Sequence, residues 1–311
     1  MRKSVKVFAP ATVANVVCGF DVLGFAVNEP GDEVIMRLTD KPGVSLLKIT
    51  GDEGRLPLNP DKNTVSAIAK QYLEHIGRPD VGIEIELHKK MPIGSGLGSS
   101  SASTVAGLFA INTLFDHQLT NRELVPFAMK GEELACGYGH ADNVAPALLG
   151  GFVLIRSYSP LDIISLPFPQ DLHAAIVYPE VDVPTKDARQ MIRSKVYLKD
   201  AVTQWGNVAG LVSGLFMNDY DLIGRSMTDV LVEPTRSILI PDFDRLRELA
   251  MESGAIGFGI SGSGPSVFAL TKDAETANRI TQKLQYHLKN IAINSLAFVS
   301  EVNKKGPVIL D

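Results

Sequence analysis

A glycine- and serine-rich segment, PIGSGLGSSSAS at residues 92–103, constrains this chain more than any other feature. Before it, Ile83, Ile85 and Leu87 alternate with polar residues as in a strand, and after it an apolar helix is predicted over residues 102–114. Alternate glycines let backbone N–H groups converge on an anion, and the start of a helix adds further donors. The segment therefore predicts a phosphate-binding loop rather than a flexible linker.

The commoner phosphate-loop patterns do not fit this segment. No lysine stands at the start of the helix, so the Walker pattern is absent. Counting from Gly94, the third glycine of the dinucleotide fingerprint would be Ser99, and counting from Gly96 it would be Ser101. The nucleophile elbow G-x-S-x-G is also missing. A dinucleotide-dependent oxidoreductase is therefore only a distant alternative.

Charge and cysteine content exclude several classes of protein. A net charge of -5 over 311 residues argues against a nucleic-acid or anionic-membrane surface, because both need a basic field. Cys18 and Cys136 are too few for a disulfide framework and lack metal-ligand spacing. No apolar segment approaches the roughly 20 residues that span a bilayer, and Lys6 and Pro10 break the N-terminal apolar run. We expect a soluble, cytoplasmic protein.

The periodicity of the remaining chain predicts a mixture of helices and strands. We expect strands at 5–8, 33–38, 44–49, 83–87, 152–155, 174–178 and 297–302, and helices at 63–72, 102–114, 120–135, 186–193, 201–217, 243–252 and 274–289, with a glycine-rich hairpin over 254–270. Because these do not alternate strictly, the pattern indicates the α+β class. Prolines at 160, 167 and 169 predict a boundary between domains at residues 1–160 and 161–311.

Two further motifs lie at a distance from the loop: PATVANVVCGFD at residues 10–21 and GFGISGSGPSVFAL at residues 257–270. In this order, the three motifs resemble those of the GHMP kinases, a family that includes galactokinase, homoserine kinase and mevalonate kinase. The resemblance implies an N-terminal α+β nucleotide-binding domain and a C-terminal ferredoxin-like α/β sandwich, with the active site in the cleft between them. It also implies ATP as co-substrate and Mg²⁺.

Within that family, the first motif is similar to the form found in homoserine kinases. Mevalonate-type members would carry a lysine shortly after Pro10, and this chain has none there. Val17 and Cys18 depart from the usual glycine and its small neighbour. Three other stretches agree with the homoserine kinases: GYGHADNVAP at 137–146, VPTKDAR at 183–189 and VEPTR at 232–236. The alternatives are a GHMP-type kinase with a mevalonate- or sugar-like acceptor, or a non-catalytic ligand sensor on the same fold.

The resemblance implies phosphorylation of the side-chain hydroxyl of L-homoserine to O-phospho-L-homoserine, a step of threonine biosynthesis. Such a substrate is a zwitterion, so its site needs cations for the carboxylate and an acid for the ammonium group. Arginine supplies forked donors to a carboxylate, and polar side chains orient the hydroxyl. The candidates for substrate binding are Asn15, Asp21, His140, Asn143, Arg189 and Arg236, whereas Asp142 is expected only to cap the helix that follows it.

The resemblance also assigns the nucleotide and metal sites. Ser100 and Glu132 are the expected Mg²⁺ ligands. Glu132 is preferred to the neighbouring carboxylate Glu133 because it stands eight residues before His140. The expected ATP-binding residues are Asn63 and Lys89, towards the nucleoside, and the loop residues Pro92, Ile93, Gly94, Ser95, Gly96, Leu97, Gly98, Ser99, Ser100, Ser101 and Ala102.

Catalysis in such a kinase depends on alignment and charge neutralisation more than on covalent chemistry by the protein. The expected catalytic residues are Ser100, Glu132, Asn143 and Thr185, with Thr185 near the transferred phosphate. No residue stands out as a general base. The small-residue turn at 259–266 is expected to lie across the cleft, and the family resemblance suggests a homodimer.

Overall fold

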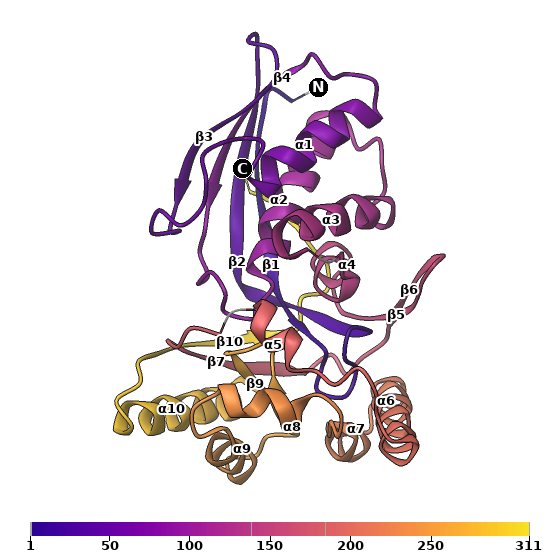
Figure 1. Cartoon of the computed structure of the whole chain (residues 1–311), viewed down its shortest axis with the longest axis vertical. Helices are drawn as coiled ribbons and strands as arrows, with labels where there is room; N and C mark the ends of the chain where they lie inside the picture. Colours follow the sequence, from indigo (N-terminus) through magenta and orange to yellow (C-terminus); the bar gives the residue numbers. More distant parts are fainter. Residues whose placement is uncertain (1, 138, 184, 311) are drawn as a thin grey trace.

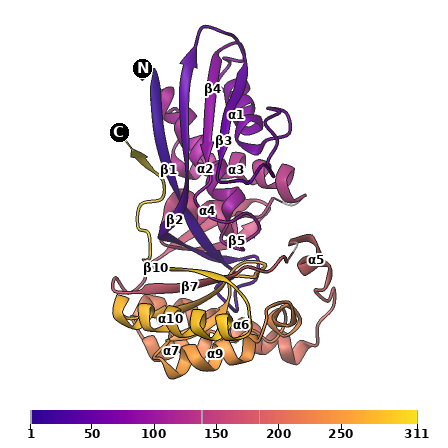
Figure 2. The ribbon, with the colours of Figure 1, turned by 90° about the vertical axis from the view of Figure 1, so that its left-hand side faces the viewer.

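The computed structural model describes residues 2–137, 139–183 and 185–310, without the side chains of residues 134–136 and 185–187. Two sheets lie one above the other, each with its own helices (Figure 1). The chain builds most of the upper half first, then the lower half, and its last residues return to the upper sheet (Figure 2). The predicted α+β class and the two-part arrangement of sheets are confirmed.

The upper half is a seven-stranded sheet covered by four helices. Its strands are β1 (Ser4–Ala14), β2 (Leu23–Thr39), β3 (Val44–Thr50), β4 (Gly82–His88), β5 (Phe152–Tyr158), β6 (Leu161–Leu166) and β11 (Val308–Leu310). The order is β11-β1-β2-β4-β3, with β5 on β2 and β6 on β5, and only the β3–β4 pair is parallel. The helices are α1 (Thr64–His75), α2 (Ser99–Leu114), α3 (Asn121–Cys136) and α4 (Ala141–Leu149).

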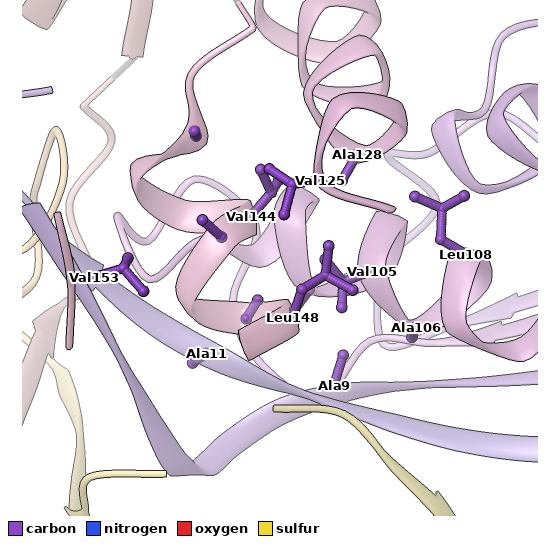
Figure 3. Close-up of a cluster of buried hydrophobic side chains, with 14 of the residues drawn as sticks. Ala9, Ala11, Val105, Ala106, Leu108, Val125, Ala128, Val144, Leu148 and Val153 are labelled. Atoms are coloured by element: carbon purple, nitrogen blue, oxygen red, sulfur yellow. The ribbon is translucent and has the colours of Figure 1, made fainter. Parts of the chain in front are cut away.

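Helix α2 lies at the centre of this half because it is apolar on all sides. Nearly all of its residues are buried, and it packs against β1, β2, α1, α3 and α4. Helices of this kind are stable only when other elements surround them. Figure 3 shows the resulting cluster between sheet and helices, formed by Ala9, Ala11, Val105, Ala106, Leu108, Val125, Ala128, Val144, Leu148 and Val153. This packing fixes where α2 begins, at the phosphate loop.

The lower half is a four-stranded antiparallel sheet with strand order β10-β7-β9-β8. Its strands are β7 (His173–Pro179), β8 (Gly257–Ile260), β9 (Val267–Thr271) and β10 (Ser295–Glu301), and its helices are α5 (Thr185–Gln190), α6 (Leu198–Met217), α7 (Tyr220–Ser226), α8 (Glu233–Arg236), α9 (Phe243–Glu252) and α10 (Ala274–Asn290). Helices separate β7 from β8 and β9 from β10. This is the split βαβ arrangement of ferredoxin-like folds, as predicted.

The two halves share apolar packing, because the lower sheet is buried on both faces. Along β7, Ala174 and Ile176 join the cluster of the upper half, whereas Ala175 and Val177 join the cluster formed with α9 and α10. The ring of Phe25 in the upper half also packs edge-on against that of Phe268 in β9, with centroids 5.8 Å apart. The halves therefore hold the cleft between them in one shape.

Two of the three prolines, Pro167 and Pro169, lie where the chain passes from the upper sheet to the lower one. The sequence divided the chain between residue 160, in the turn of the β5–β6 hairpin, and residue 161, which begins β6, so the upper sheet continues to Leu166. The division at residue 160 stays a prediction about domains, but the strands change sheet between residues 167 and 172. Short elements escaped prediction altogether, namely β6, α7, α8 and β11.

Other predictions have clear outcomes. The Thr120–Glu123 capping box opens α3 as expected. Cys18 is buried with a free thiol, whereas the side chain of Cys136 lies outside the described residues. Every helix along the described chain is too short or too polar to span a bilayer.

Candidate active site

A cleft of about 490 Å³ lies where the two halves meet, within the range of small-molecule sites. It is lined by the phosphate loop, by α3, by the first turn of α4, and by residues of the lower half. Most of the predicted site residues line it: Asn15, Asp21, Asn63, Lys89, Ile93, Gly94, Ser95, Gly96, Gly98, Ser99, Ser100, Ser101, Glu132, His140, Asn143, Arg189 and Arg236.

A few predicted residues do not line the cleft. Leu97 and Ala102 are fully buried in the hydrophobic core, so their side chains support the loop from behind. Pro92 stands outside the lining as well. Thr185 begins α5, but its side chain lies outside the described residues, so its predicted contact with the reacting groups stays a prediction.

The phosphate loop carries buried hydroxyls that have no hydrogen-bond partner among the described residues. The side chains of Ser95 and Ser99 make no hydrogen bond with any described residue. Helix α2 begins just after Gly98, whose left-handed φ of 65° turns the chain into the helix. Because buried polar groups in proteins are almost always hydrogen-bonded, these hydroxyls and the open helix start fit an anionic ligand such as a phosphate.

The glycine-rich turn at 259–266 lies against this loop. The hydroxyl of Ser261 donates to the carbonyl of Gly96 at 2.8 Å, and the backbone N–H of Ser266 donates to the carbonyl of Ser95 at 3.1 Å. A Cβ at Gly96 would stand 2.5 Å from the carbonyl oxygen of Ser261, so only glycine permits this approach. The turn therefore holds the phosphate loop to the lower half, as its small residues predict.

The ammonium group of Lys89 is bonded to other residues of the protein. Its buried ammonium contacts Asp32 and donates to the carbonyl of Ser99 and the hydroxyl of Ser103, both at 2.7 Å. Burial lowers the pKa of Lys89, and the Asp32 carboxylate opposes that shift. The lysine thus positions the first turn of α2, while its predicted contact with ATP stays a prediction.

Asn63, which also lines the cleft, is engaged in hydrogen bonds as well. Its Oδ1 accepts from the N–H of Val65 at 3.1 Å and caps α1, and its Nδ2 donates to the carbonyl of Pro57 at 3.3 Å. Leu56 and Leu87 also line the cleft. The amide of Asn63 thus holds the start of α1, and its predicted contact with ATP stays a prediction.

Glu132 on α3 is a carboxylate that lines the cleft beside the start of α2. Its Oε1 is buried without a hydrogen-bond partner among the described residues. Burial raises its pKa, and the hydroxyls of Ser101 and Ser100 oppose that rise, which places them beside it. A cation at this point would be favoured because it supplies the missing partner of the carboxylate. The rival Glu133 is exposed and does not line the cleft.

The described residues contain no cluster of three or more His, Cys, Asp or Glu side chains that could hold a metal by themselves. Mg²⁺ is usually bound through one or two carboxylates, waters and substrate phosphates rather than by an all-protein cage. The single Glu132 carboxylate beside the Ser100 hydroxyl fits that mode.

Two arginines and an aspartate form the other end of the cleft. Arg189 makes a forked contact with Asp21, at 2.8 Å from Nη2 and 3.3 Å from Nη1. Arg236 is only 5% exposed, and it donates to the carbonyls of Gly262 at 3.1 Å and Ala188 at 3.2 Å. These contacts bring cations from α5 and α8 to the same place as a carboxylate from the first motif.

Phe20 supports both arginines from one side. Its ring centroid lies 5.6 Å from the guanidinium of Arg189 and 5.1 Å from that of Arg236, within the distance of a cation–π contact. The phenylalanine of the first motif, which the sequence did not assign to the site, thus orients the two cations.

The two asparagines are fixed by hydrogen bonds from neighbouring segments. Asn15 donates to the carbonyl of Gly262 at 2.8 Å and accepts from the N–H of Asp21 at 3.0 Å. Asn143 accepts from the hydroxyl of Thr12 at 2.6 Å. His140 lies further out, with Nδ1 3.9 Å from Asp21, and burial lowers its pKa. Asn15 and His140 thus lie beside Asp21, whereas Asn143 lies beside the phosphate loop, where a Cβ at Gly98 would come within 2.8 Å of its Oδ1.

Asp142 is the residue that sequence reasoning missed. It was assigned only a capping role, but its carboxyl lines the cleft, is 4% exposed, and has an Oδ1 without a partner among the described residues. Burial, with a smaller contribution from Asp21, raises its pKa to about 7. Its place between His140 and Asn143 in the GHADN motif is the signal that could have revealed it.

Comparison with known proteins agrees with this geometry. The N-terminal domain of the GHMP kinases matches residues 63–151, and the C-terminal domain of the same family matches residues 210–290. A homoserine kinase of Chlorobium phaeobacteroides is 48% identical over 99% of this chain and 100% of that protein. The chain belongs to the GHMP kinase family. Its three motifs are therefore those of a GHMP kinase, as the sequence predicted.

Solved structures extend the likeness to the whole fold. The crystal structure of a homoserine kinase from Cytophaga hutchinsonii is 59% identical and covers all of this GHMP kinase and 98% of its own chain, with a TM-score of 0.97. A mevalonate kinase from L. major, solved with R-mevalonate, covers 97% of the chain and 98% of its own, at 15% identity with a TM-score of 0.74, and shares the fold alone.

Proposed function

We propose that this chain transfers the γ-phosphoryl group of ATP to the side-chain hydroxyl of L-homoserine, giving O-phospho-L-homoserine for threonine biosynthesis. The observation that carries the proposal is a single cleft with two unlike ends. One end has unpartnered loop hydroxyls and a buried carboxylate, and the other has two arginines and two aspartates. Full-length relatives called homoserine kinase, at 48% and 59% identity, support the same acceptor.

The acid and arginine end suits a zwitterionic amino acid. Asp21 and Arg189 form a pair in which each side chain can turn to the substrate group of opposite charge. Arg236 offers a second cation to the carboxylate, and Asp142 a second acid to the ammonium group. A cation beside Asp142 would favour its ionised form, so substrate binding would supply the partner that its Oδ1 lacks. Asn15, His140 and Asn143 would orient the remaining polar atoms.

The loop end suits the phosphates of ATP. Loop N–H groups and the start of α2 would bind them, and Lys89 would hold that start in place through its contacts with Ser99 and Ser103. Ser100 and Glu132 would hold Mg²⁺, which neutralises charge on the phosphates when bound. Asn143 and Thr185 would contact the reacting groups. Because phosphoryl transfer depends mainly on alignment and charge, this arrangement needs no dedicated base.

ADP release with a panel of acceptors tests the proposal. L-homoserine should give turnover at least tenfold above L-serine, L-threonine and mevalonate. Preference for mevalonate or a sugar would assign the chain to another GHMP-type activity. Intact ligand binding without turnover would indicate a sensor.

A matched pair of glutamate variants tests the metal site. Glu132→Gln should lower kcat by a factor of about 100 or more, because it removes a charge that stabilises the transferred group. Glu133→Gln removes the same charge one residue away, on an exposed position, and should leave kcat within about twofold. Equal effects of the two variants would contradict the assignment of Glu132.

The family resemblance suggests in addition a homodimer, which we propose together with a cytoplasmic location, where ATP is supplied. The free buried thiol of Cys18 suits such a reducing compartment.

A further inference from the structure

The end of β5 brings one side chain close to the two aspartates of the cleft. Tyr158 is the last residue of β5, in a hairpin that packs beside α4 (Figure 1). Its hydroxyl donates to the backbone carbonyl of Asp21 at 2.7 Å and accepts from the backbone N–H of Ala141 at 3.3 Å. Tyr158 itself does not line the cleft. One hydroxyl therefore joins the first motif to the start of α4 from outside the cleft.

We propose that Tyr158 is a positioning residue for the amino-acid acceptor, because its hydroxyl fixes the places of the two acids, Asp21 and Asp142, that receive the ammonium group. This role rests on the proposed function, in which both aspartates are assigned to that group. The tyrosine acts through the backbone, since both of its hydrogen bonds go to backbone atoms.

The backbone of Asp21 is held on both sides. Its N–H donates to Oδ1 of Asn15 at 3.0 Å, and its carbonyl accepts from Tyr158. Its φ of 61° is left-handed, a conformation that persists at a residue other than glycine only where its surroundings hold it. The direction of the carboxylate follows from this backbone, and the carboxylate meets Nη2 of Arg189 at 2.8 Å. Without the tyrosine hydroxyl, one of the two backbone contacts is lost.

The second hydrogen bond acts on the first turn of α4. The first N–H groups of a helix have no partner within it. His140, which precedes α4, makes no side-chain cap, and the hydroxyl of Tyr158 accepts from the first of these groups, that of Ala141. The rings of Tyr158 and His140 also meet edge to face, with centroids 6.3 Å apart. Because Asp142 follows directly, this contact sets where the turn presents its carboxyl to the cleft.

The surroundings keep the tyrosine hydroxyl protonated. Burial, and after it the nearby charge of Asp142, raise the pKa of Tyr158 well above its usual value, and the N–H of Ala141 opposes that rise. At neutral pH the hydroxyl therefore keeps the proton that it donates to the carbonyl of Asp21.

Tyr158→Phe tests this role, because it keeps the ring and removes only the hydroxyl. The KM for L-homoserine should rise about tenfold as both acids lose a support. The ammonium group does not react, so kcat should stay within about twofold, and so should the KM for ATP. Tyr220→Phe is the matched control. Its hydroxyl also donates to an acidic residue, Asp171, but neither residue lines the cleft, so its kinetics should be those of the wild type.

Amide hydrogen exchange measures the same bridge without any acceptor. In the full chain without ligands, the N–H of Ala141 should exchange about tenfold faster in Tyr158→Phe than in the wild type, while the amides of α2 exchange as before. A wild type that does not use L-homoserine would overturn the proposed function and this role with it. In a wild type that does use L-homoserine, the role alone is overturned by an unchanged KM in Tyr158→Phe, by an equal rise in both KM values, by the same rise in Tyr220→Phe, or by unchanged exchange at Ala141.

Discussion

Asp142 makes a prediction about stability that can be worked through quantitatively. In the folded chain its pKa rises from 3.8 to about 7, mainly because the carboxyl is buried. Each unit corresponds to about 1.36 kcal/mol, so ionising this group in the folded state costs up to about 4 kcal/mol. The cost applies to the protein without substrate, because a bound cation would offset it.

The direction of the pH dependence follows from where the proton sits. Between pH 3.8 and about 7 the folded chain keeps a proton on Asp142 that the unfolded chain has lost. The free energy of unfolding therefore falls as the pH rises through this window, and the loss is complete above it. Asp142→Asn removes the titration, so its stability relative to the wild type should grow by up to about 4 kcal/mol between pH 4 and pH 8.

Urea unfolding at several pH values measures this difference. The amide of the variant changes the packing as well, but that contribution to the free energy of unfolding is the same at every pH. The test is therefore how the difference between variant and wild type changes with pH, and not its size at any one pH. Asp40→Asn, in an exposed turn after β2, is the matched control for the removal of one carboxyl group. A pH-independent difference for Asp142→Asn would refute the argument that burial governs this carboxyl.

The other predictions concern the loop and its supports. Gly98→Ala puts a Cβ 2.2 Å from the hydroxyl of Thr12, so kcat/KM should fall well below that of Gly94→Ala, a control whose Cβ meets nothing within 4 Å. Lys89→Met leaves Asp32 buried without its cation and should cost about 3–5 kcal/mol in urea unfolding, most of it regained when Asp32→Asn is added. Arg236→Lys should raise the KM for L-homoserine about tenfold and leave kcat nearly unchanged, because lysine cannot make forked contacts with a carboxylate that does not react; a change confined to kcat would contradict that role.

The sequence predicted those elements whose periodicity is regular. The strand β4 alternates strictly and was found within one residue at each end, and α2 was recognised from its apolar length. For β1 and β2 only the outer ends were predicted. Their inner ends lack alternation because they are buried on both faces, and Pro10 interrupts the apolar run of β1. Burial between two halves of a fold erases the pattern on which strand prediction depends.

Most of the residues that the sequence assigned to the site line one cleft, for a physical reason. Motif residues are fixed by chemistry that the ligand demands, so the arginines of α5 and α8 could be placed beside Asp21 without any knowledge of packing. The ionisation and pairing of Lys89 and Asp142 could not be predicted from the sequence. Whether a charge is paired or suppressed depends on burial by distant elements, and Asp32, which engages Lys89, lies 57 positions earlier in the chain.

In the first motif, packing stabilises left-handed backbone angles at residues that are not glycine. Asn15, Val16 and Val17 all have left-handed φ angles, of 71°, 43° and 62°, a conformation that costs a β-branched residue about 1–2 kcal/mol. Both valines are buried, and each gains about 1.5–3 kcal/mol from that burial, enough to offset the strain. Room for Val17 comes from Gly259, where a Cβ would lie 2.6 Å from the valine side chain. The loop therefore keeps the left-handed turn of a glycine without having one at this position, because a glycine in the C-terminal motif supplies the space. That exchange leaves Asn15 anchored between the two halves, on the carbonyl of Gly262 and the N–H of Asp21.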